Sequence, residues 1–273
     1  MVVGPCVSQP SVFTNSLGIE FVLIKPGTMV VGKFAPPYPV AEDTVKNAKR
    51  PLAMWMGSGR SYNESELKLA RELAIKDALP GFEVHITKHF YIGKFEITQA
   101  QWKKVMEANP SVFQSGLVSS PDSHPVENVT WQDVQEFIRK LNEMEKTTAY
   151  RLPTEFEWEF AARAGEANDI AWSDIQRMAV LGTKTTQPVG QKTANAWGLY
   201  DMLGNVWEWV GDIYNEKIFA DPDPSSEGSQ HVLKGASFVG DVKNATYMTH
   251  AAGPGNGWDV GFRLVFSMDE ESR

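Results

Sequence analysis

Cysteine is almost absent from this 273-residue chain, because Cys6 is the single one. One thiol excludes an internal disulfide and any zinc site built from paired cysteines. No stretch approaches the roughly 20 apolar residues that a membrane helix needs. Cations are also scarce, with 26 Lys and Arg against 34 Asp and Glu and a formal net charge of -8. Because binding to nucleic acids needs clustered cations, we expect no nucleic-acid partner.

What remains is the composition of an ordinary globular protein, with 42% hydrophobic and 22% charged residues. We find no internal repeat and no low-complexity linker, so we expect a single soluble domain over residues 1–273, with a core at about 17–266. Residues 33–80 combine a Pro- and Gly-rich stretch with a helix expected from Ser65 to Ala78. We interpret them as a loop and helix insertion.

Short β-rich segments open the chain. Residues 21–24 and 29–31 are separated by the turn dipeptide Pro26-Gly27, which predicts a hairpin. Residues 82–96 are predicted to form one further strand. His85 and His89 share a face of that strand, but they would lie roughly 13 Å apart, too far for one metal ion, so we expect solvent-facing histidines.

Three helices are signalled by their first residues. Thr98 and Gln101 form a capping-box pattern that opens a helix to about Ala108. Thr130 caps a second helix, in which apolar residues at positions 134, 137, 138 and 141 form a core-facing stripe. Thr154 with Glu157 caps a third.

The run from Asn195 to Val210 packs three Trp, two acids, two Gly and two Asn into one short segment. With several further motifs in matching order, the chain resembles the formylglycine-generating (sulfatase-modifying) enzyme family. The motifs are Phe95–Trp102, Pro125–Asp133, Tyr150–Arg163, Asn195–Trp209, Lys234–Phe238 and Gly261–Leu264. The resemblance implies an α+β domain with a variant of the C-type lectin fold and much irregular structure.

The same resemblance implies a structural calcium site in the Trp-rich run. Transferred position by position, its ligands are the side chains of Asp201 and Glu208 and the backbone carbonyls of Gly204 and Val206. Carboxylates and carbonyls are the oxygen ligands that calcium takes. The alternative is a Trp-rich packing segment whose acids bond backbone amides.

The catalytic chemistry of the family is not expected here. Its oxygen-dependent enzymes bind copper(I) through two cysteine thiolates, soft ligands for a soft ion. The two corresponding positions hold Gly240 and Ala245, so we expect no copper. Tyr247, Thr249 and Gly253 stand where basic residues are usual. A serine mechanism lacks support, because Ser237 belongs to a family packing motif and His250 has no identifiable third member.

Residues 238–260 replace the catalytic pocket with unusual side chains between intact motifs. This arrangement resembles the variable proteins of diversity-generating retroelements, in which this segment forms a diversified ligand-binding face. We therefore predict a noncatalytic ligand-binding protein. The predicted face consists of Phe238, Asp241, Lys243, Tyr247, His250, Asn256, Trp258 and Asp259. Two alternatives stay open: a family member whose pocket has drifted, and a periplasmic enzyme or maturation factor that acts without the two cysteines.

The expected partner is an unknown protein or other macromolecule, bound by a monomer. Residues 1–10 are too short and too polar for a secretory signal. We nevertheless expect an exported protein, at a bacterial surface or in the periplasm, whose signal is not present in this sequence. Cys6 would suit a lipid anchor, although Val3-Gly4-Pro5 before it is a poor lipoprotein cleavage signal.

Overall fold

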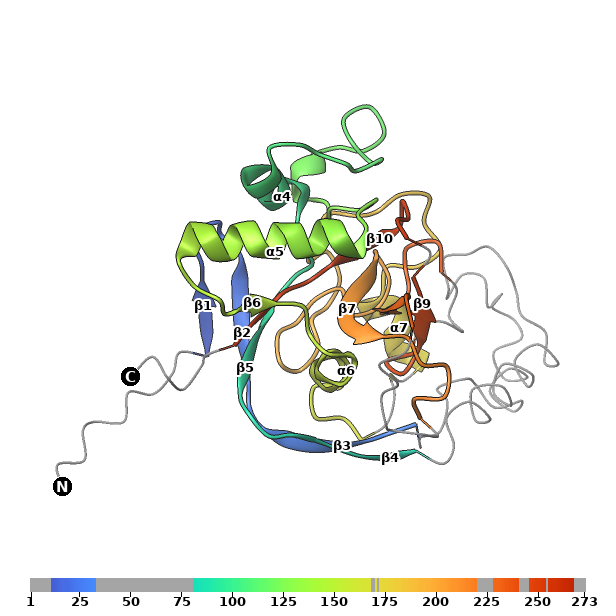
Figure 1. Ribbon diagram of the computed structural model, residues 1–273. Helices are drawn as coiled ribbons and strands as arrows, with labels where there is room; N and C mark the ends of the chain where they lie inside the picture. Colours follow the sequence, from blue (N-terminus) through green and yellow to red (C-terminus); the bar gives the residue numbers. More distant parts are fainter. Residues whose placement is uncertain are drawn as a thin grey trace, which may run out of the picture.

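The computed structural model describes residues 11–32, 81–167, 170, 172–219, 228–240, 246–253 and 255–267. It is an α+β arrangement of three small sheets with helices packed beside them (Figure 1). The predicted insertion at 33–80 and Cys6 lie outside the described residues. Within the part of the chain described, no helix has both the length and the apolar character needed to cross a bilayer.

A five-stranded antiparallel sheet joins the two ends of the described chain. Its order is β1-β2-β5-β11-β6, and the C-terminal β11 lies between β5 and β6. The strands are β1 (Val12–Thr14), β2 (Glu20–Ile24), β5 (Phe90–Gly93), β6 (Tyr150–Arg151) and β11 (Val265–Phe266). All of its strand pairs are antiparallel.

The predicted hairpin at Pro26-Gly27 is wrong. The strand β3 (Gly27–Val31) pairs with β4 (Phe82–Ile86), whereas β2 pairs with β1 and β5. Residues 20–31 therefore run beside residues 82–93 as one long ribbon that bends from one sheet into the next. A side chain at Gly27 would lie 2.8 Å from the Phe160 ring, so glycine serves close packing here rather than chain reversal. The single strand predicted over 82–96 is correspondingly two strands.

A four-stranded sheet contains or adjoins most of the family-like sequence motifs. Its order is β10-β7-β8-β9, with β10 parallel to β7 and the other pairs antiparallel. The strands are β7 (Trp207–Ile213), β8 (His231–Lys234), β9 (His250–Ala252) and β10 (Val260–Phe262). The sheet therefore sets the Trp-rich run beside the motifs at 234–238 and 261–264.

The helices begin where the capping patterns predict. Each helix begins with a complete capping box at Thr98, Thr130 or Thr154. The threonine side chain accepts a hydrogen bond from the backbone amide of the N3 residue, and the N3 side chain accepts one from the backbone amide of the threonine. These caps open α4 (Gln99–Met106), α5 (Trp131–Glu145) and α6 (Glu155–Arg163). The structure adds α7 (Trp172–Met178) and the short 3-10 helix η1 (Pro121–Ser123).

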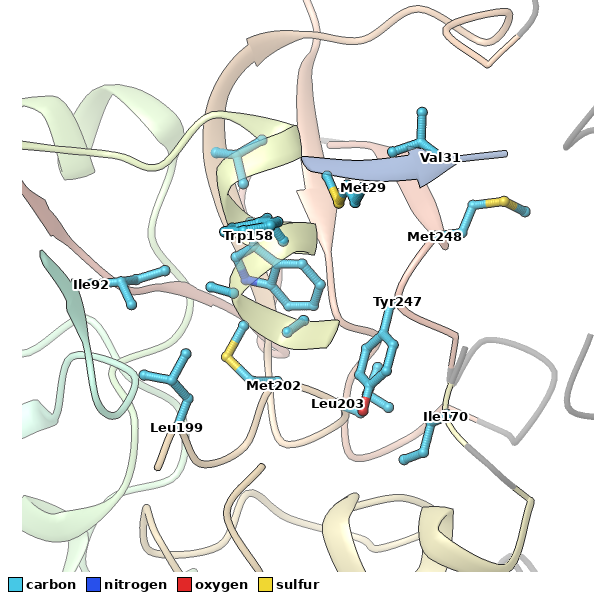
Figure 2. Packing of buried hydrophobic residues seen from close by; sticks show 14 of the residues in the cluster. Met29, Val31, Ile92, Trp158, Ile170, Leu199, Met202, Leu203, Tyr247 and Met248 are labelled. Atoms are coloured by element: carbon cyan, nitrogen blue, oxygen red, sulfur yellow. The ribbon is translucent and has the colours of Figure 1, made fainter. Parts of the chain in front are cut away.

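The core consists of two large clusters. The predicted stripe of α5 is buried, and Phe137 stacks on Trp102 of α4 with ring centroids 5.2 Å apart. The second cluster surrounds Trp158 of α6, which is fully buried beneath the ribbon residues Met29 and Val31 (Figure 2). Helix α6 thereby connects the bent ribbon to the four-stranded sheet.

Candidate functional site

The start of the Trp-rich run is tied to α6 through one amide. Asn195 donates from Nδ2 to the Ala161 carbonyl at 2.8 Å, and its Oδ1 accepts from the amides of Trp197 and Leu199 at 3.0 and 3.1 Å. The side chain satisfies turn amides that would otherwise be buried without partners.

Glu208 forms a buried ion pair that sequence reasoning missed. Arg263 donates from Nε and from a terminal nitrogen to the two Glu208 oxygens, at 2.7 Å each. Trp158 Nε1 donates to the same carboxylate at 2.7 Å. The remaining Arg263 donors reach the carbonyls of Gly93 and Tyr200. Two-point pairing of this kind fixes the relative position of β7 and the segment after β10.

Two further buried carboxylates share this environment. Glu96 accepts from the Val206 amide at 3.1 Å and from Asn205 Nδ2 at 2.7 Å. Burial raises the pKa of Glu96 well above its ordinary value, and the charges of Asp201 and Glu208 raise it further. Three buried acids thus face one guanidinium, which leaves an excess of negative charge in the absence of bound protons or cations.

Asp201 is the acid in this group that has an oxygen without a hydrogen-bond partner. Its Oδ2 accepts from the Gly190 amide at 2.6 Å, whereas its Oδ1 is buried and has no hydrogen-bond partner. Burial raises the pKa of Asp201 to about 6. The residue lines a cavity of about 10 Å³, room for one water-sized atom.

The four predicted calcium ligands fit the ion in part. Within the described residues, no group of three His, Cys, Asp or Glu side chains is placed so that it could hold a metal ion by itself, so any cation here would depend on carbonyls as well. The carbonyls of Gly204 and Val206 take no part in the loop hydrogen bonds of the described chain, and Asp201 has a free oxygen. Glu208 differs from the prediction, because Arg263 already occupies both of its oxygens.

The predicted ligand face does not form one surface. Phe238 is fully buried and Tyr247 is 4% exposed, which corrects the prediction that their rings meet a ligand directly. Phe238 sits in a small cluster with Phe113, and Tyr247 packs into the Trp158 cluster (Figure 2). Apolar packing between loops explains both positions. Asp241 and Lys243 lie outside the described residues.

Trp258 does lie at the surface, and other exposed apolar residues lie near it in the fold. It is 46% exposed, and its ring contacts Phe238 and Phe113 at centroid distances of 5.3 and 6.0 Å. Three other exposed apolar residues are sequence neighbours of this aromatic cluster. Val112 precedes Phe113, Val239 follows Phe238, and Leu117 precedes Val118, which packs against the cluster. We define the Trp258 patch as Val112, Leu117, Val239 and Trp258. Sequence reasoning missed the first three, which lie outside the predicted face or beside it.

Polar groups border the patch. Ser237 donates to Asp259 Oδ2 at 2.7 Å, and the exposed Asn256 donates to Asn128 Oδ1 at 2.9 Å. Beneath them, Glu127 accepts from the amides of Val112 and Phe113 at 3.0 and 2.9 Å. Burial raises the pKa of Glu127, and the charge of Asp259 raises it further. The hydrogen bonds from the two amides act in the opposite direction and lower this pKa, but burial has the larger effect.

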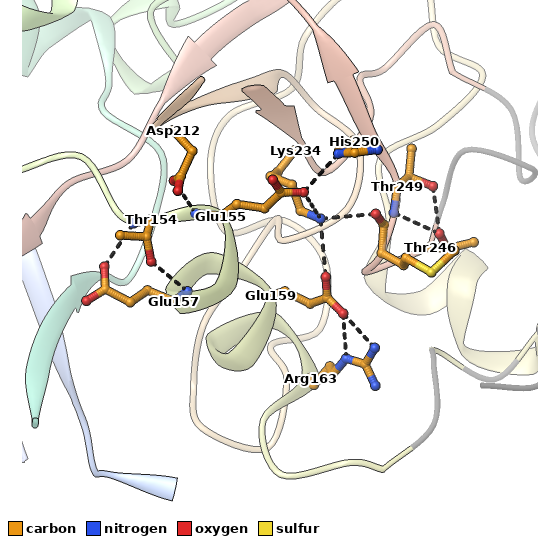
Figure 3. Close-up of polar contacts among 11 residues, drawn as sticks. Thr154, Glu155, Glu157, Glu159, Arg163, Asp212, Lys234, Thr246, Thr249 and His250 are labelled. Atoms are coloured by element: carbon orange, nitrogen blue, oxygen red, sulfur yellow. Dashed lines mark hydrogen bonds and ion pairs between the residues drawn. The ribbon is translucent and has the colours of Figure 1, made fainter. Parts of the chain in front are cut away.

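His250 lies in a different place, in a buried charge network (Figure 3). Its Nδ1 is 3.0 Å from Glu155 Oε1 but is not aligned for a hydrogen bond. Burial acts to raise the pKa of Glu155, but His250 and Lys234 together lower it below its ordinary value. The fully buried Lys234 lies 3.4 Å from Glu159, which also pairs with Arg163 at 2.6 Å. This network joins α6 to β8 and β9.

The positions where the family carries its thiols hold no such chemistry. A Cβ atom at Gly240 would lie 2.9 Å from the Ser237 carbonyl oxygen, so the backbone there leaves no room for a side chain without movement. Ala245 lies outside the described residues.

Comparison with known proteins agrees with these motifs. The family model of the sulfatase-modifying factor enzyme 1-like domain matches residues 14–268. A chaperone protein named LppX from Paenibacillus barcinonensis is 30% identical over 270 residues, covering 77% of this chain and 92% of that protein. A formylglycine-generating enzyme of Streptomyces coelicolor is 31% identical over 164 residues, 51% of this chain and 48% of the enzyme.

Two solved structures share the fold over nearly the whole chain. Variable protein 1 of Treponema denticola gives a TM-score of 0.69 at 23% identity, covering 94% of this chain and 99% of that one. PvdO from Pseudomonas aeruginosa also gives 0.69, at 22% identity, covering 96% and 100%. The fold is thus of the formylglycine-generating, C-type lectin-like type, as the motifs predict.

Proposed function

Because the chain belongs to the family of sulfatase-modifying factor enzyme 1-like domains yet has a single cysteine, we propose that it is a noncatalytic ligand-binding protein. The Trp258 patch is its binding surface. One observation carries the proposal: an aromatic side chain is held half-exposed above two buried aromatic rings, Phe113 and Phe238. A supported, rigid aromatic group in an apolar setting is the usual anchor of a protein interface.

The cysteine count supports the noncatalytic part of the proposal. Copper(I) chemistry of the family type needs two thiolates, and the chain has only Cys6. Gly240, at one of the two positions, is closely packed against the Ser237 carbonyl. We expect a sulfatase-type peptide containing cysteine to keep its mass after incubation with this protein, copper and oxygen. A mass change that depends on the protein would overturn the noncatalytic assignment.

We further propose a structural calcium ion at Asp201. Its free Oδ1, the Glu208 carboxylate and the carbonyls of Gly204 and Val206 would hold the ion. A bound divalent cation supplies positive charge to a cluster with three acids. Chelation should lower the melting temperature and added calcium should restore it. An unchanged melting temperature would remove calcium from the proposal.

The binding proposal is tested with two single variants. Trp258→Ser removes the central ring, and Met144→Ser is its control, because Met144 is 52% exposed on α5 and lies outside the patch. Affinity capture from extracts of the native host should recover species that bind wild type and Met144→Ser but not Trp258→Ser. Equal recovery on all three folded proteins would refute a role for the patch.

A second candidate function is assistance to the maturation of another protein. It is favoured by the similarity to the LppX chaperone protein, which extends over most of both chains. The two functions separate in a refolding assay with a captured species as the client. A maturation factor raises the yield of active client at substoichiometric amounts, whereas a simple binder protects only the molecules that it holds.

A further inference from the structure

We infer that Asn256 is a site of spontaneous deamidation, at which the backbone nitrogen of Gly257 displaces the side-chain amide as ammonia and water then leaves a carboxylate. Three observations carry the inference: the Asn-Gly sequence, the exposure of Asn256, and the unbonded backbone amide of Gly257. The modification itself does not depend on the proposed binding function, because it is a reaction of the chain with water.

The sequence makes this position unusual. Asn256-Gly257 is the one Asn-Gly dipeptide in the chain, and every other asparagine is followed by a residue that carries a side chain. Asparagine is among the thermolabile residues. Glycine has no Cβ atom, so its own side chain does not shield its nitrogen, and the backbone has the freedom to bend toward the asparagine. The dipeptide is therefore the position where this ring closure meets the least steric resistance.

The fold leaves both reacting groups open. Asn256 is exposed, and within the described part of the chain its side chain makes one hydrogen bond, from Nδ2 to Asn128 Oδ1 at 2.9 Å. Among the same residues, the backbone amide of Gly257 donates to no acceptor, so its nitrogen can attack without breaking a backbone hydrogen bond. Asn205 shows the contrast, because it is fully buried and both ends of its side-chain amide are bonded.

The reaction balances with water as its co-reactant. The Gly257 nitrogen loses its proton and bonds to Asn256 Cγ, and the Cγ–Nδ2 bond breaks as that nitrogen leaves with the proton as ammonia. The product is a cyclic imide. Water opens the imide at one carbonyl to give aspartate, or at the other to give iso-aspartate, in which the backbone runs through the side-chain carbon. The deprotonated amide nitrogen is the nucleophile, so the rate should rise with pH.

The new carboxylate is poorly matched to its surroundings. It accepts hydrogen bonds but donates none, so it cannot replace the bond to Asn128 Oδ1. Asn128 cannot turn its amide to compensate without losing its own bond from Nδ2 to the Pro110 carbonyl at 2.9 Å. A second carboxylate already lies in this loop, because Asp259 Oδ1 is 3.1 Å from the position that a Cβ atom on Gly257 would take. Like charges at this spacing repel each other.

The iso-aspartate product also changes the backbone. The Gly257 carbonyl accepts hydrogen bonds from the amides of Asn128 and Val260, at 2.9 Å each. An additional backbone carbon directly before Gly257 displaces this carbonyl from both donors. The segment that carries Trp258 should therefore be held less firmly after the reaction. Under the proposed function, deamidation would cause a slow and irreversible loss of the binding surface.

Peptide mass spectrometry of the full chain after incubation at pH 6 and at pH 9 tests the inference. We expect Asn256 to gain the mass of an exchange of NH2 for OH, faster at pH 9, with separate aspartate and iso-aspartate peptides. Asn256→Asp provides the reference for the aspartate peptide. Asn256→Gln is the matched control, because its longer side chain closes a ring less readily, and its peptide should keep its mass. Asn215, a half-buried loop residue followed by Glu216, should also stay unchanged.

Two outcomes would overturn the inference. One is that Asn256 keeps its mass in the folded protein but is converted in guanidinium chloride, which would show that the fold protects it. The other is conversion of Asn215 at the same rate, which would show that the Asn-Gly sequence has no special effect.

Hydrogen exchange tests the consequence for the loop. The amides of Asn128 and Val260 should exchange faster in the deamidated protein than in fresh wild type, and unchanged exchange would refute the predicted loosening. None of these measurements uses a ligand, so failure of the proposed binding function and failure of this inference are distinguishable.

Discussion

The ionisation of Asp201 should contribute to the way in which the stability of this protein depends on pH. Its folded pKa is raised from 3.8 to about 6 because the carboxyl is buried with an oxygen that has no partner. Between these two values the unfolded chain releases a proton that the folded protein keeps. Stability from this group therefore falls as pH rises from about 4 to about 6, and it stays lower above that range.

The size of the effect follows from the shift. A difference of roughly two pKa units corresponds to about 3 kcal/mol at neutral pH. Asp201→Asn keeps the shape and an acceptor for the Gly190 amide but carries no charge. The variant should therefore gain stability relative to wild type as pH rises, by up to about 3 kcal/mol in the presence of a chelator.

Urea unfolding at several pH values between 4 and 8, followed by circular dichroism, measures this difference. Asp212→Asn is the matched control, because burial also raises the pKa of Asp212 to about 6, beside the Glu155 amide and away from the calcium ligands. Both variants should show the pH effect, but calcium should reverse it only for Asp201. A difference between wild type and Asp201→Asn that is constant across this pH range would refute the reasoning.

Three further substitutions test the charge networks and the caps. Arg263→Met leaves Glu208 buried without its partner and should cost about 3 to 5 kcal/mol in urea unfolding, whereas an unchanged midpoint would mean that the carboxylate is hydrated. Lys234→Met removes the cation between Glu155 and Glu159 and should destabilise the protein by a similar amount, about 3 kcal/mol or more. The loss should be larger at pH 8 than at pH 5, because Lys234 helps to keep the pKa of Glu155 low and Glu155 takes up a proton more readily without it. Thr154→Ala should cost about 1 kcal/mol, and Thr154→Ser should restore most of it, because the hydroxyl caps α6.

Local signals in the sequence predicted local structure well. Each capping box opens a helix at its threonine, and the α5 stripe is buried, because both depend on residues three or four positions apart. The prediction of a hairpin at Pro26-Gly27 was wrong because strand pairing depends on residues far away in the sequence. Ile24 meets Phe90 and Gly27 meets Ile86, and no turn dipeptide carries that information.

The candidate site shows the same division. Glu208 was identified as a functional carboxylate from its motif, but its partner Arg263 lies 55 positions away in another motif. An arginine inside an otherwise apolar motif before β11 was the signal that could have found the pair, since a buried guanidinium needs a carboxylate. No comparable signal identifies the Trp258 patch. Its members become neighbours only because Phe113, Phe238 and Trp258 pack together.

The internal pairing of charges explains how a scaffold of this type can change its surface without losing its fold. Glu208 is matched by Arg263 and Glu159 by Arg163, all within helices, strands or the short segments that join them. These pairs depend on no residue of the loops that carry Val112, Val239 or Trp258. Substitutions in those loops should therefore change the proposed binding surface at little cost to the core, whereas a change in either ion pair should cost stability. Under the proposed function, binding specificity and folding thus depend on separate residues of this chain.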